Sequence, residues 1–396
     1  MNIWIVKVGE PLDLEGNSYM RNYVLARELV KRGHKVTYFT SGFNHQLKKW
    51  IKRVEGTFMS KDGINIEIIN GCGYKNNFSF RRYVDYKIIA WKFKRIIEKK
   101  TKPNIIIASL PTNDLVVVSA DFAEKNKIPL IVDIRDPWPD IIIKRLPFFL
   151  RPLLWLDDFK IRKALNKSKA IIGVSLDLLN WGLKKVARNK KENDKVFYLG
   201  SRKLIDTNWL DQRFGEFLNS DKLTLGYVGT FGQSADPGTV LKLIKENSEY
   251  QIVLIGSGGF KKEMEDKYSS LEDVLFTGWL EPNQIFSVLK RCDAGVCPTA
   301  TDNHLFPNKV FTYMAAGLPI LSAYKGELKE ILEKEKIGFY YQKDNVEDLA
   351  RQIKKLENAQ DRQEMSERVT NLFSKHFDSG NIYRAYADHV EKMIKK

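Results

Sequence analysis

Apolar residues in this chain gather in short runs separated by longer stretches with helical spacing, which is the pattern of strands that alternate with helices. In the first half the apolar runs predict strands at 3–8, 35–40, 104–108, 130–134, 170–175 and 197–199. In the second half they predict strands at 223–229, 251–255, 274–277, 294–297 and 320–323. Strands connected through helices are typical of a parallel sheet. We therefore predict an α/β protein with two Rossmann-like, doubly wound domains.

The length of the chain supports this division. A chain of 396 residues exceeds one ordinary domain and suits two, each large enough to bury its own core. We expect a first Rossmann-like domain over residues 1–200, a second over 201–380, and a C-terminal helix over 381–396.

Two stretches of the first half are both amphipathic and basic. Residues 78–102 place apolar side chains at helical spacing among many lysines and arginines, and we predict a helix whose apolar stripe packs on the sheet. Residues 140–169 combine apolar runs with flanking basic residues, which leaves two interpretations: docking on anionic lipid, or a helix buried against the rest of the domain. The membrane contacts in the first interpretation are Phe148, Phe149, Arg151 and Trp155.

The net charge of +16 comes from the first half alone. Residues 1–200 hold 38 Lys and Arg against 20 Asp and Glu, a balance of +18, whereas residues 201–396 hold 27 against 29, a balance of −2. A basic domain suits a phosphorylated substrate, an anionic membrane or nucleic acid. Because the basic residues accompany aliphatic runs rather than exposed stacking aromatics, we expect an anionic membrane surface and no nucleic acid as partner.

The first residues of the chain, the length of its apolar runs and its cysteines indicate where in the cell the protein is expected. The segment MNIWIVKVGEP reads as a strand without a cleavage pattern, and no apolar run approaches 18 residues. We therefore expect a cytoplasmic protein that associates peripherally with the inner face of the cell membrane. Cys72, Cys292 and Cys297 are too scattered for a disulfide framework or a zinc site, and we expect them to be small buried hydrophobes.

The most informative stretch runs from Asp302 to Leu321 and reads DNHLFPNKVFTYMAAGLPIL. Pro307 precedes a short run of helix formers, and Gly317 with Pro319 ends that run before a buried strand. The pattern predicts a loop, a helix N-terminus and a return to the sheet.

The start of this helix suits an anion. We expect free amides at Asn308, Lys309 and Val310, at the positive end of the helix dipole, with the Lys309 side chain beside them. A diphosphate fits such a site without requiring a metal. An ordinary helix-strand unit with a solvated Lys309 has the same spacing and remains the alternative.

This stretch resembles the family-4 glycosyltransferases of the GT-B fold, especially the bacterial branch that builds cell-surface polysaccharides such as O-antigen and capsule. The family carries the signature P-x-K-x-F-E-Y-M-A-x-G-x-P in its donor site. The matching positions here are Pro307, Lys309, Phe311, Tyr313, Met314, Ala315, Gly317 and Pro319. The resemblance implies two Rossmann-like domains that face each other across a cleft. It also implies that the C-terminal helix over 381–396 crosses back to the first domain, with Tyr383, Tyr386 and Val390 as its contacts.

Two positions depart from the family pattern. Thr312 stands where the signature has a glutamate that binds the ribose hydroxyls of the donor, and His304 stands where a glutamate faces the transferred sugar. The resemblance still implies that Thr312 contacts the donor and that His304 lies in the catalytic centre.

Glycine-rich turns after two predicted strands extend the donor site. The candidate donor-binding residues in these turns are Gly229, Thr230, Gly232, Gly256 and Gly258. Glycine allows the backbone to approach a nucleotide closely. Family relatives carry an arginine and a lysine after the first turn, whereas this chain reads GTFGQSAD, so the diphosphate depends more heavily on Lys309.

In the first domain the resemblance points to two segments. The family's loop after the first strand packs against the donor, which makes Gly16 and Asn17 candidates, with a plain turn between strand and helix as the alternative. The segment DIRDPWPD resembles a family variant and places Arg135 and Asp136 at the carboxyl end of a strand, where open α/β sheets bind ligands. With His304 these two residues form the predicted catalytic set.

The resemblance implies a retaining glycosyltransferase of the hexosyl or N-acetylhexosaminyl type. The second domain would bind a nucleotide sugar, expected to be a UDP-sugar, and the first domain a lipid-linked or oligosaccharide acceptor for cell-surface polysaccharide biosynthesis. We expect no metal and no cofactor besides the donor. Two alternatives remain: a nucleotide-sugar epimerase of the same fold, and a non-catalytic GT-B subunit, which the loss of both family glutamates keeps open.

Overall fold

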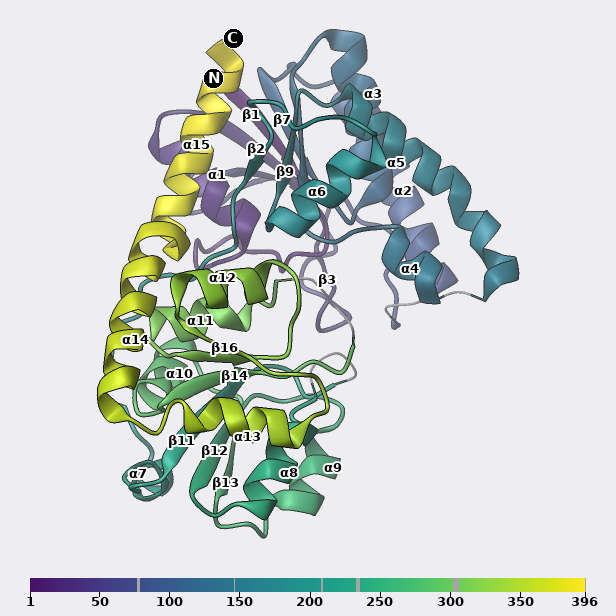
Figure 1. Ribbon diagram of the computed structural model, residues 1–396. Coiled ribbons are helices and arrows are strands. Elements are labelled where there is room, and N and C mark those ends of the chain that lie inside the picture. The colour runs from purple at the N-terminus through teal and green to yellow at the C-terminus, as the bar shows by residue number, and fades with distance from the viewer. Residues whose placement is uncertain (77–78, 146, 208, 233–235, 302–305, 396) are drawn as a thin grey trace. The chain divides into compact units, whose positions relative to one another are not determined.

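The computed structural model describes residues 1–76, 79–145, 147–207, 209–232, 236–301 and 306–395. The chain divides into two compact units, shown in Figure 1: unit 1 comprises Met1–Tyr198 together with Tyr383–Lys396, and unit 2 comprises Leu199–Ile382.

Unit 1 is built on a mostly parallel sheet. Its strands are β1 (Asn2–Val6), β2 (Lys35–Thr40), β5 (Gly56–Met59), β6 (Asn65–Ile68), β7 (Ile105–Ser109), β8 (Leu130–Ile134), β9 (Ala170–Gly173) and β10 (Lys195–Val196), beside a small hairpin of β3 (Phe43–Asn44) and β4 (Lys49–Trp50). Over the described residues the sheet has eight strands in the order β10-β9-β8-β7-β1-β2-β6-β5, and only the β5–β6 pair is antiparallel. The chain changes direction across the sheet between β1 and β7, so ligands are expected at the carboxyl ends of these two strands.

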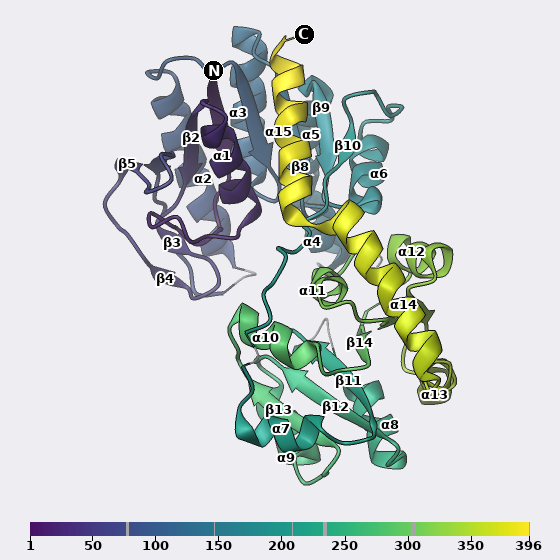
Figure 2. The same cartoon turned by 90° about the vertical axis from the view of Figure 1, so that its left-hand side faces the viewer.

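Helices cover this sheet. They are α1 (Arg21–Lys31), α2 (Phe80–Ile97), α3 (Asn113–Asn126), α4 (Asp140–Arg145), the 3-10 helix η1 (Phe148–Leu154), α5 (Trp155–Lys167), α6 (Leu176–Lys185) and, from Tyr383 onward, α15 (Ser379–Lys395). Figures 1 and 2 show α15 beside α1. Tyr386 and Val390 of α15 share one apolar core with Tyr23 and Leu29 of α1, and His34 Nε2 lies 2.7 Å from a Glu391 oxygen. The last helix thus contributes to the core of unit 1.

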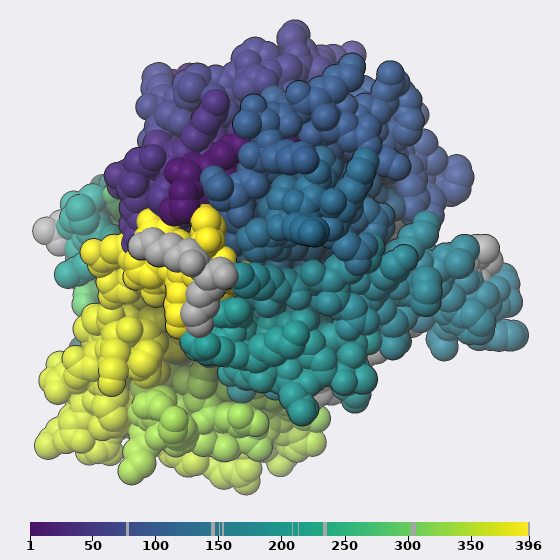
Figure 3. Space-filling view, turned by 90° about the horizontal axis from the view of Figure 1, so that it is seen from above, coloured from purple at the N-terminus to yellow at the C-terminus, as the bar shows by residue number. Residues whose placement is uncertain are grey.

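The two amphipathic stretches differ in burial. The predicted apolar stripe of α2 is confirmed, since Ile89, Phe93 and Ile97 are buried. The other stretch is divided: Ile161, Ala164 and Leu165 in the second half of α5 are buried, whereas Phe148 is 78% exposed and Trp155 is 65% exposed. Figure 3 shows the part of unit 1 that contains η1 and the start of α5, coloured blue-green, projecting from the rest of the unit.

Two expectations for unit 1 need correction, and two strands of its sheet were not predicted. The predicted strand at 197–199 is wrong: the last strand is β10, and the carbonyls of Phe197 and Tyr198 accept hydrogen bonds from Arg21 Nη1 at 2.8 and 3.2 Å instead. The antiparallel pair of strands β5 and β6 was not predicted, because β5 alternates in burial and β6 contains the polar residues Asn65 and Glu67, so neither is a continuous apolar run. Cys72 is half-buried rather than buried.

Unit 2 repeats the architecture with a smaller parallel sheet. Its strands are β11 (Leu223–Val228), β12 (Tyr250–Ile255), β13 (Val274–Gly278), β14 (Ala294–Cys297), β15 (Ile320–Ser322) and β16 (Gly338–Tyr340). Over the described residues their order is β13-β12-β11-β14-β15-β16, and every pair is parallel. The switch point of this sheet lies between β11 and β14.

The helices of unit 2 precede, separate and follow these strands along the chain. They are α7 (Gln212–Leu218), α8 (Gly238–Glu246), α9 (Lys261–Tyr268), α10 (Pro282–Leu289), α11 (Lys309–Ala315), α12 (Glu327–Glu335), α13 (Val346–Lys354), α14 (Ala359–Leu372) and the π-helical turn η2 (Phe373–Phe377). The sequence pattern did not predict α7, α10, α12 or the short strand β16. The α/β fold with two Rossmann-like parallel-sheet units is confirmed.

Within the described ranges, no helix has both the length and the apolar character needed to cross a membrane. The same part of the chain holds no group of three or more His, Cys, Asp or Glu side chains placed to hold a metal ion.

Candidate functional site

The candidate donor site lies at the switch point of unit 2. Gly229 follows β11, Gly256 follows β12, and the loop after β14 leads to α11, which begins at Lys309. All three segments therefore leave the carboxyl edge of the sheet, where open α/β folds bind their ligands.

Close packing explains why glycine occurs in the two turns that follow β11 and β12. A Cβ added to Gly256 would lie 2.0 Å from the Gly229 carbonyl oxygen, and one added to Gly258 would lie 2.2 Å from the Phe231 carbonyl oxygen. Backbone hydrogen bonds join the turns: Gly229 N–H donates to Ile255 O at 3.0 Å and Phe231 N–H donates to Ser257 O at 3.2 Å. The glycines thus let one turn lie directly against the other. This packing accounts for glycine at both positions without any contact to a nucleotide.

Lys309 is the candidate residue for binding an anion in unit 2. Its Nζ lies 3.9 Å from the centroid of the Tyr227 ring, and a Cβ added to Gly229 would lie 3.0 Å from it. Although part of the residue reaches the surface, Nζ is buried and has no hydrogen-bond partner among the described residues. Burial lowers the pKa of Lys309 to about 8, with the Cys297 thiol acting in the opposite direction.

A buried ammonium needs an anion or several acceptors to offset its lost hydration. The Tyr227 ring face attracts the cation but does not neutralise it. The arrangement therefore suits an incoming phosphate, and the alternative of a solvated Lys309 is wrong.

Tyr313 anchors the helix that carries Lys309. Its hydroxyl donates to Val296 O and accepts from Val228 N–H, both at 2.9 Å, so it joins α11 to β14 and β11. Its ring lies against Gly295, where an added Cβ would be 2.4 Å from the ring. This fully buried tyrosine fixes Lys309 relative to the switch point.

The other predicted donor residues differ in their placement. Asn308 is exposed before α11, and Thr312 is half-buried on it. The expectation of a free Val310 amide is wrong, because Val310 N–H donates to Pro307 O at 3.2 Å in the turn that opens the short helix. Thr230 is exposed, and its carbonyl accepts from Tyr227 Oη at 3.1 Å.

The remaining predicted positions of unit 2 are Gly232 and His304. At Gly232 an added Cβ would meet nothing within 4 Å, so no packing reason for this glycine is visible. His304 lies outside the described residues.

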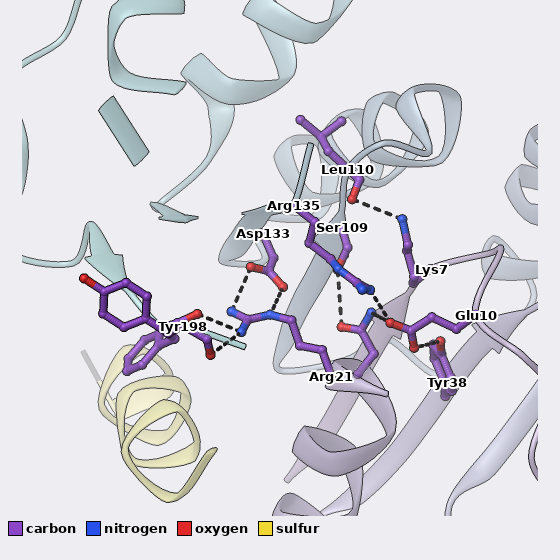
Figure 4. Close-up of polar contacts among 11 residues, drawn as sticks. Lys7, Glu10, Arg21, Tyr38, Ser109, Leu110, Asp133, Arg135 and Tyr198 are labelled. Atoms are coloured by element: carbon purple, nitrogen blue, oxygen red, sulfur yellow. Dashed lines mark hydrogen bonds and ion pairs between the residues drawn. The ribbon is translucent and has the colours of Figure 1, made fainter. Parts of the chain in front are cut away.

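Unit 1 has a buried charged cluster at its own switch point (Figure 4). Glu10, in the loop after β1, accepts from Tyr38 Oη at 2.8 Å and from Asn22 Nδ2 at 3.2 Å, and pairs with Arg135. The predicted catalytic residue Arg135 is thus held by a carboxylate 125 positions away in the sequence. Its neighbour Asp136 is half-buried.

A second ion pair holds the strand before Arg135. Arg21 Nε donates to Asp133 Oδ2 at 2.7 Å and Nη2 donates to Oδ1 at 3.0 Å, with both side chains fully buried. Because this guanidinium also binds the Phe197 and Tyr198 carbonyls, it ties α1, β8 and the end of the sheet together (Figure 4).

Lys7 is the third charged group of the cluster. It follows β1, is 5% exposed, and donates from Nζ to the Leu110 carbonyl at 3.1 Å. Burial, and next the positive charge of Arg135, lower the pKa of Lys7 to about 7. The cluster thus presents a lysine and an arginine at the carboxyl edge of unit 1.

The loop that contains Gly16 and Asn17 is stabilised by hydrogen bonds within the loop. Asp13 accepts hydrogen bonds from the Glu15 and Gly16 amides at 2.9 and 3.1 Å, and a Cβ added to Gly16 would lie 2.8 Å from Asp62. Gly16, at φ +82°, is therefore required by the turn itself. Asn17 is exposed beside it.

Sequence reasoning missed Lys7, Glu10 and Tyr227. A signal was present for the first two, because charged residues at the end of an apolar run such as IWIV are expected at a strand's carboxyl edge. Tyr227 reads as an ordinary core residue, and its ring contact with Lys309 depends on the fold.

Comparison with known protein families agrees with this architecture. Residues 21–190 match the model described as Glycosyltransferase Family 4, and residues 210–371 match the model described as Glycosyl transferases group 1. The chain is built of two glycosyltransferase domains on the GT-B fold. A search of curated proteins finds no match to this sequence.

Solved glycosyltransferase structures resemble the chain over its whole length. Sucrose-phosphate synthase from Thermosynechococcus elongatus has a TM-score of 0.74 at 14% identity, covering 100% of this chain and 99% of its own. HepE from Anabaena, solved with UDP and glucose, has a TM-score of 0.66 at 15% identity, covering 99% and 100%. WaaG, a glycosyltransferase involved in lipopolysaccharide biosynthesis, has a TM-score of 0.64 at 13% identity, covering 98% and 99%. At these identities the likeness shows the shared fold.

Proposed function

We propose that this glycosyltransferase moves a hexosyl or N-acetylhexosaminyl group from a UDP-sugar to a lipid-linked acceptor, with retention of anomeric configuration, in the biosynthesis of a cell-surface polysaccharide. Unit 2 binds the donor and unit 1 binds the acceptor. The observation that carries the proposal is the buried Lys309 ammonium, which has no hydrogen-bond partner among the described residues and lies at the switch point of a Rossmann-like sheet.

The diphosphate of the donor is the proposed partner of Lys309. An ammonium that is already desolvated attracts a phosphate more strongly than one in water, and Tyr313 holds its helix in place before the ligand arrives. This positive charge is proposed to offset the charge of the leaving group without a metal ion. A UDP donor is favoured because HepE, a protein of the same fold, was solved with UDP-glucose.

In the proposed reaction the bond between the anomeric carbon and the diphosphate oxygen breaks, and the electron pair leaves with UDP. The acceptor hydroxyl oxygen forms the new bond to the same face of the anomeric carbon, and its proton passes to the departing phosphate. Lys309 stabilises the negative charge that develops on the diphosphate. Retention is proposed from the sequence resemblance to a retaining family.

The acceptor assignment is supported by the surface of unit 1. Phe148, Phe149 and Trp155 expose most of their area to solvent, and Arg151 is exposed beside them. Removing such rings from water and placing basic residues near anionic headgroups both favour a membrane surface. We therefore propose that the protein docks on the inner face of the cell membrane, where a lipid-linked acceptor is found.

Product analysis tests the proposal. Purified protein is incubated with radiolabelled UDP-hexoses and UDP-N-acetylhexosamines, with and without an extract of lipid-linked saccharides, and in the presence of EDTA. We expect label to move into the lipid fraction and UDP to be released, at the same rate with EDTA. An epimerised nucleotide sugar formed without acceptor would indicate an epimerase, and UDP-sugar binding without turnover would indicate a non-catalytic subunit.

A further inference from the structure

Tyr227, a buried residue of β11, contacts both Lys309 and the turn that follows this strand. Its ring faces the ammonium of Lys309, with Nζ 3.9 Å from the ring centroid. Its hydroxyl donates to the Thr230 carbonyl at 3.1 Å, and its ring stacks on Phe231 with the two centroids 5.5 Å apart. One side chain thus joins the lysine of the candidate donor site to the neighbouring turn.

This turn is in turn joined to the one that follows β12. Phe231 N–H donates to the Ser257 carbonyl oxygen at 3.2 Å, and Phe260 N–H donates to the Phe231 carbonyl oxygen, also at 3.2 Å. Phe231 itself is fully buried. Hydrogen bonds and ring contacts therefore connect Tyr227 to both glycine-containing turns at the carboxyl edge of the sheet.

The ring of Tyr227 also accounts for the buried position of the Lys309 ammonium. Nζ is buried and has no hydrogen-bond partner among the described residues, although the residue as a whole is only half-buried. Burying an unpaired ammonium is unfavourable, so a lysine that reaches the surface gains hydration by turning outward. The face of an aromatic ring attracts a desolvated cation and opposes this movement.

We propose that Tyr227 is a positioning residue of the donor site, whose ring holds the ammonium of Lys309 where the diphosphate binds and whose hydroxyl fixes the adjacent turn. The inference rests on the proposed function, because it names a residue that prepares Lys309 for the donor. Without the ring, the ammonium turns towards solvent, and a donor that binds must first draw it back. Tyr227 itself does not touch the diphosphate in this proposal.

The titration of Lys309 reports where its ammonium lies. Within the described residues, the titratable groups that touch or act on this ammonium are Tyr227 from β11 and the Cys297 thiol from β14. Burial raises the pKa of Tyr227, and it raises the pKa of Cys297 to about 12, so both stay neutral to pH 9.5. Burial lowers the pKa of Lys309 to about 8. A change in the pH dependence of UDP binding above pH 7 therefore reports the surroundings of the lysine.

Calorimetry with UDP between pH 7 and 9.5 tests the proposal on two substitutions. Tyr227→Met removes the ring and fills most of its space with a flexible apolar chain, whereas Tyr227→Phe keeps the ring and removes only the hydroxyl. We expect Tyr227→Met to bind UDP about tenfold more weakly at pH 7, on the scale of a cation held against a ring face. Its affinity should stay constant between pH 8 and 9.5, because a solvated lysine has a pKa of about 10.4. Tyr227→Phe should lose about threefold or less and keep the wild-type pH dependence.

Tyr250→Met is the matched control for the loss of a buried ring. Tyr250 belongs to the same apolar core as Tyr227, but it is the first residue of β12 and so lies at the amino edge of the sheet, where its hydroxyl donates to Glu357 at 2.7 Å. This variant should be destabilised as Tyr227→Met is, yet bind UDP with wild-type affinity. An equal loss of UDP affinity in both variants would overturn the proposal, since general loosening of unit 2 would then explain the result.

The wild-type protein allows a measurement that needs no substitution at Tyr227. In its proton NMR spectrum, the ε-methylene resonances of Lys309, identified by their absence in Lys309→Ala, should be shifted upfield by the ring and should titrate near pH 8. Resonances at the positions of ordinary solvated lysines would overturn the proposal, whether or not the Tyr227 variants fold.

The outcomes separate this inference from the proposed function. Wild-type affinity and pH dependence in Tyr227→Met, together with weakened binding in Lys309→Ala, would overturn the role of Tyr227 and leave the donor role of Lys309 intact. Equal losses in Tyr227→Met and Tyr227→Phe would overturn the role of the ring. If the wild-type protein does not bind UDP, the proposed function is contradicted instead, and the NMR titration still decides whether the ring holds the ammonium.

Discussion

The ring of Tyr227 faces the ammonium of Lys309, whose Nζ lies 3.9 Å from the ring centroid. Tyr227 is itself fixed, because its hydroxyl donates to the Thr230 carbonyl at 3.1 Å. A ring face stabilises a desolvated cation by about 2 kcal/mol. It leaves the protons of the ammonium available, so the protein keeps a buried positive charge ready for a phosphate.

The protonation of Lys309 should make donor binding depend on pH. Its pKa is lowered to about 8, so in the free protein the ammonium loses its proton as the pH rises above that value. A phosphate monoester, with a pKa of about 6, stays fully ionised over the same range. We expect UDP affinity to fall by up to about tenfold per pH unit between pH 8 and 9.5.

Calorimetry at several pH values measures this effect. The Lys309→Ala variant has no group that titrates at this position, so its weaker affinity should change little over the range. A wild-type affinity that stays constant to pH 9.5 would mean that the lysine does not contact the diphosphate.

Thr312 provides a second prediction about the donor. In the family that the sequence resembles, a glutamate at this position binds the ribose, whereas a threonine hydroxyl can offer only a neutral hydrogen bond. A bond to a carboxylate is stronger by about 1–2 kcal/mol, so Thr312→Glu should tighten UDP binding by roughly tenfold, while Thr312→Gln should change it less. Weaker binding in Thr312→Glu would show that this pocket is built differently from the family's.

The alternation of strands and helices could be predicted from the sequence because each parallel strand is a separate apolar run. The strands β7 and β14 follow this rule, and both were expected within a residue of their observed bounds. The rule failed for β5, whose alternating burial reflects its place at the sheet edge, and for β6, whose apolar residues are interrupted by Glu67. It also failed for β10, which is only two residues long.

The candidate site was only partly accessible from sequence. The importance of Lys309 follows from its place at the start of a helix, but its burial depends on Tyr227 in β11 and on Gly229, which follows that strand. The Glu10–Arg135 ion pair joins residues 125 positions apart, and no local sequence pattern predicts it. Such contacts arise from the topology of the sheet rather than from neighbouring residues.

The buried Arg21–Asp133 pair should be essential to the stability of unit 1. Asp133→Asn leaves a fully buried guanidinium without its counter-charge, which costs about 3–5 kcal/mol. Asp388→Asn removes a carboxylate that is 69% exposed and pairs with Arg32, so it should cost less than about 1 kcal/mol. Urea unfolding of both variants compares the two free energies, and equal losses would contradict the buried role.

Membrane docking by the η1–α5 region leads to a further prediction. Co-sedimentation with vesicles should rise with the fraction of anionic lipid and fall with salt, because each basic residue near such a surface contributes about 1 kcal/mol. A Phe148→Ser, Phe149→Ser double variant should lose most of this binding. Trp279→Ser, which removes a ring that is 68% exposed in unit 2, should not. If the wild-type protein ignores anionic vesicles at low salt, the acceptor is soluble.

The central claim, that Lys309 binds the donor diphosphate, is tested most directly by calorimetric titration of UDP at pH 7 into the wild-type protein and the Lys309→Ala variant. Removing a preorganised charge contact should cost about 2–4 kcal/mol, which corresponds to a loss of affinity of roughly 30- to 1000-fold. Lys290→Ala, which removes an exposed lysine from the same unit, should bind UDP as the wild type does. Wild-type UDP affinity in a folded Lys309→Ala variant would contradict the account.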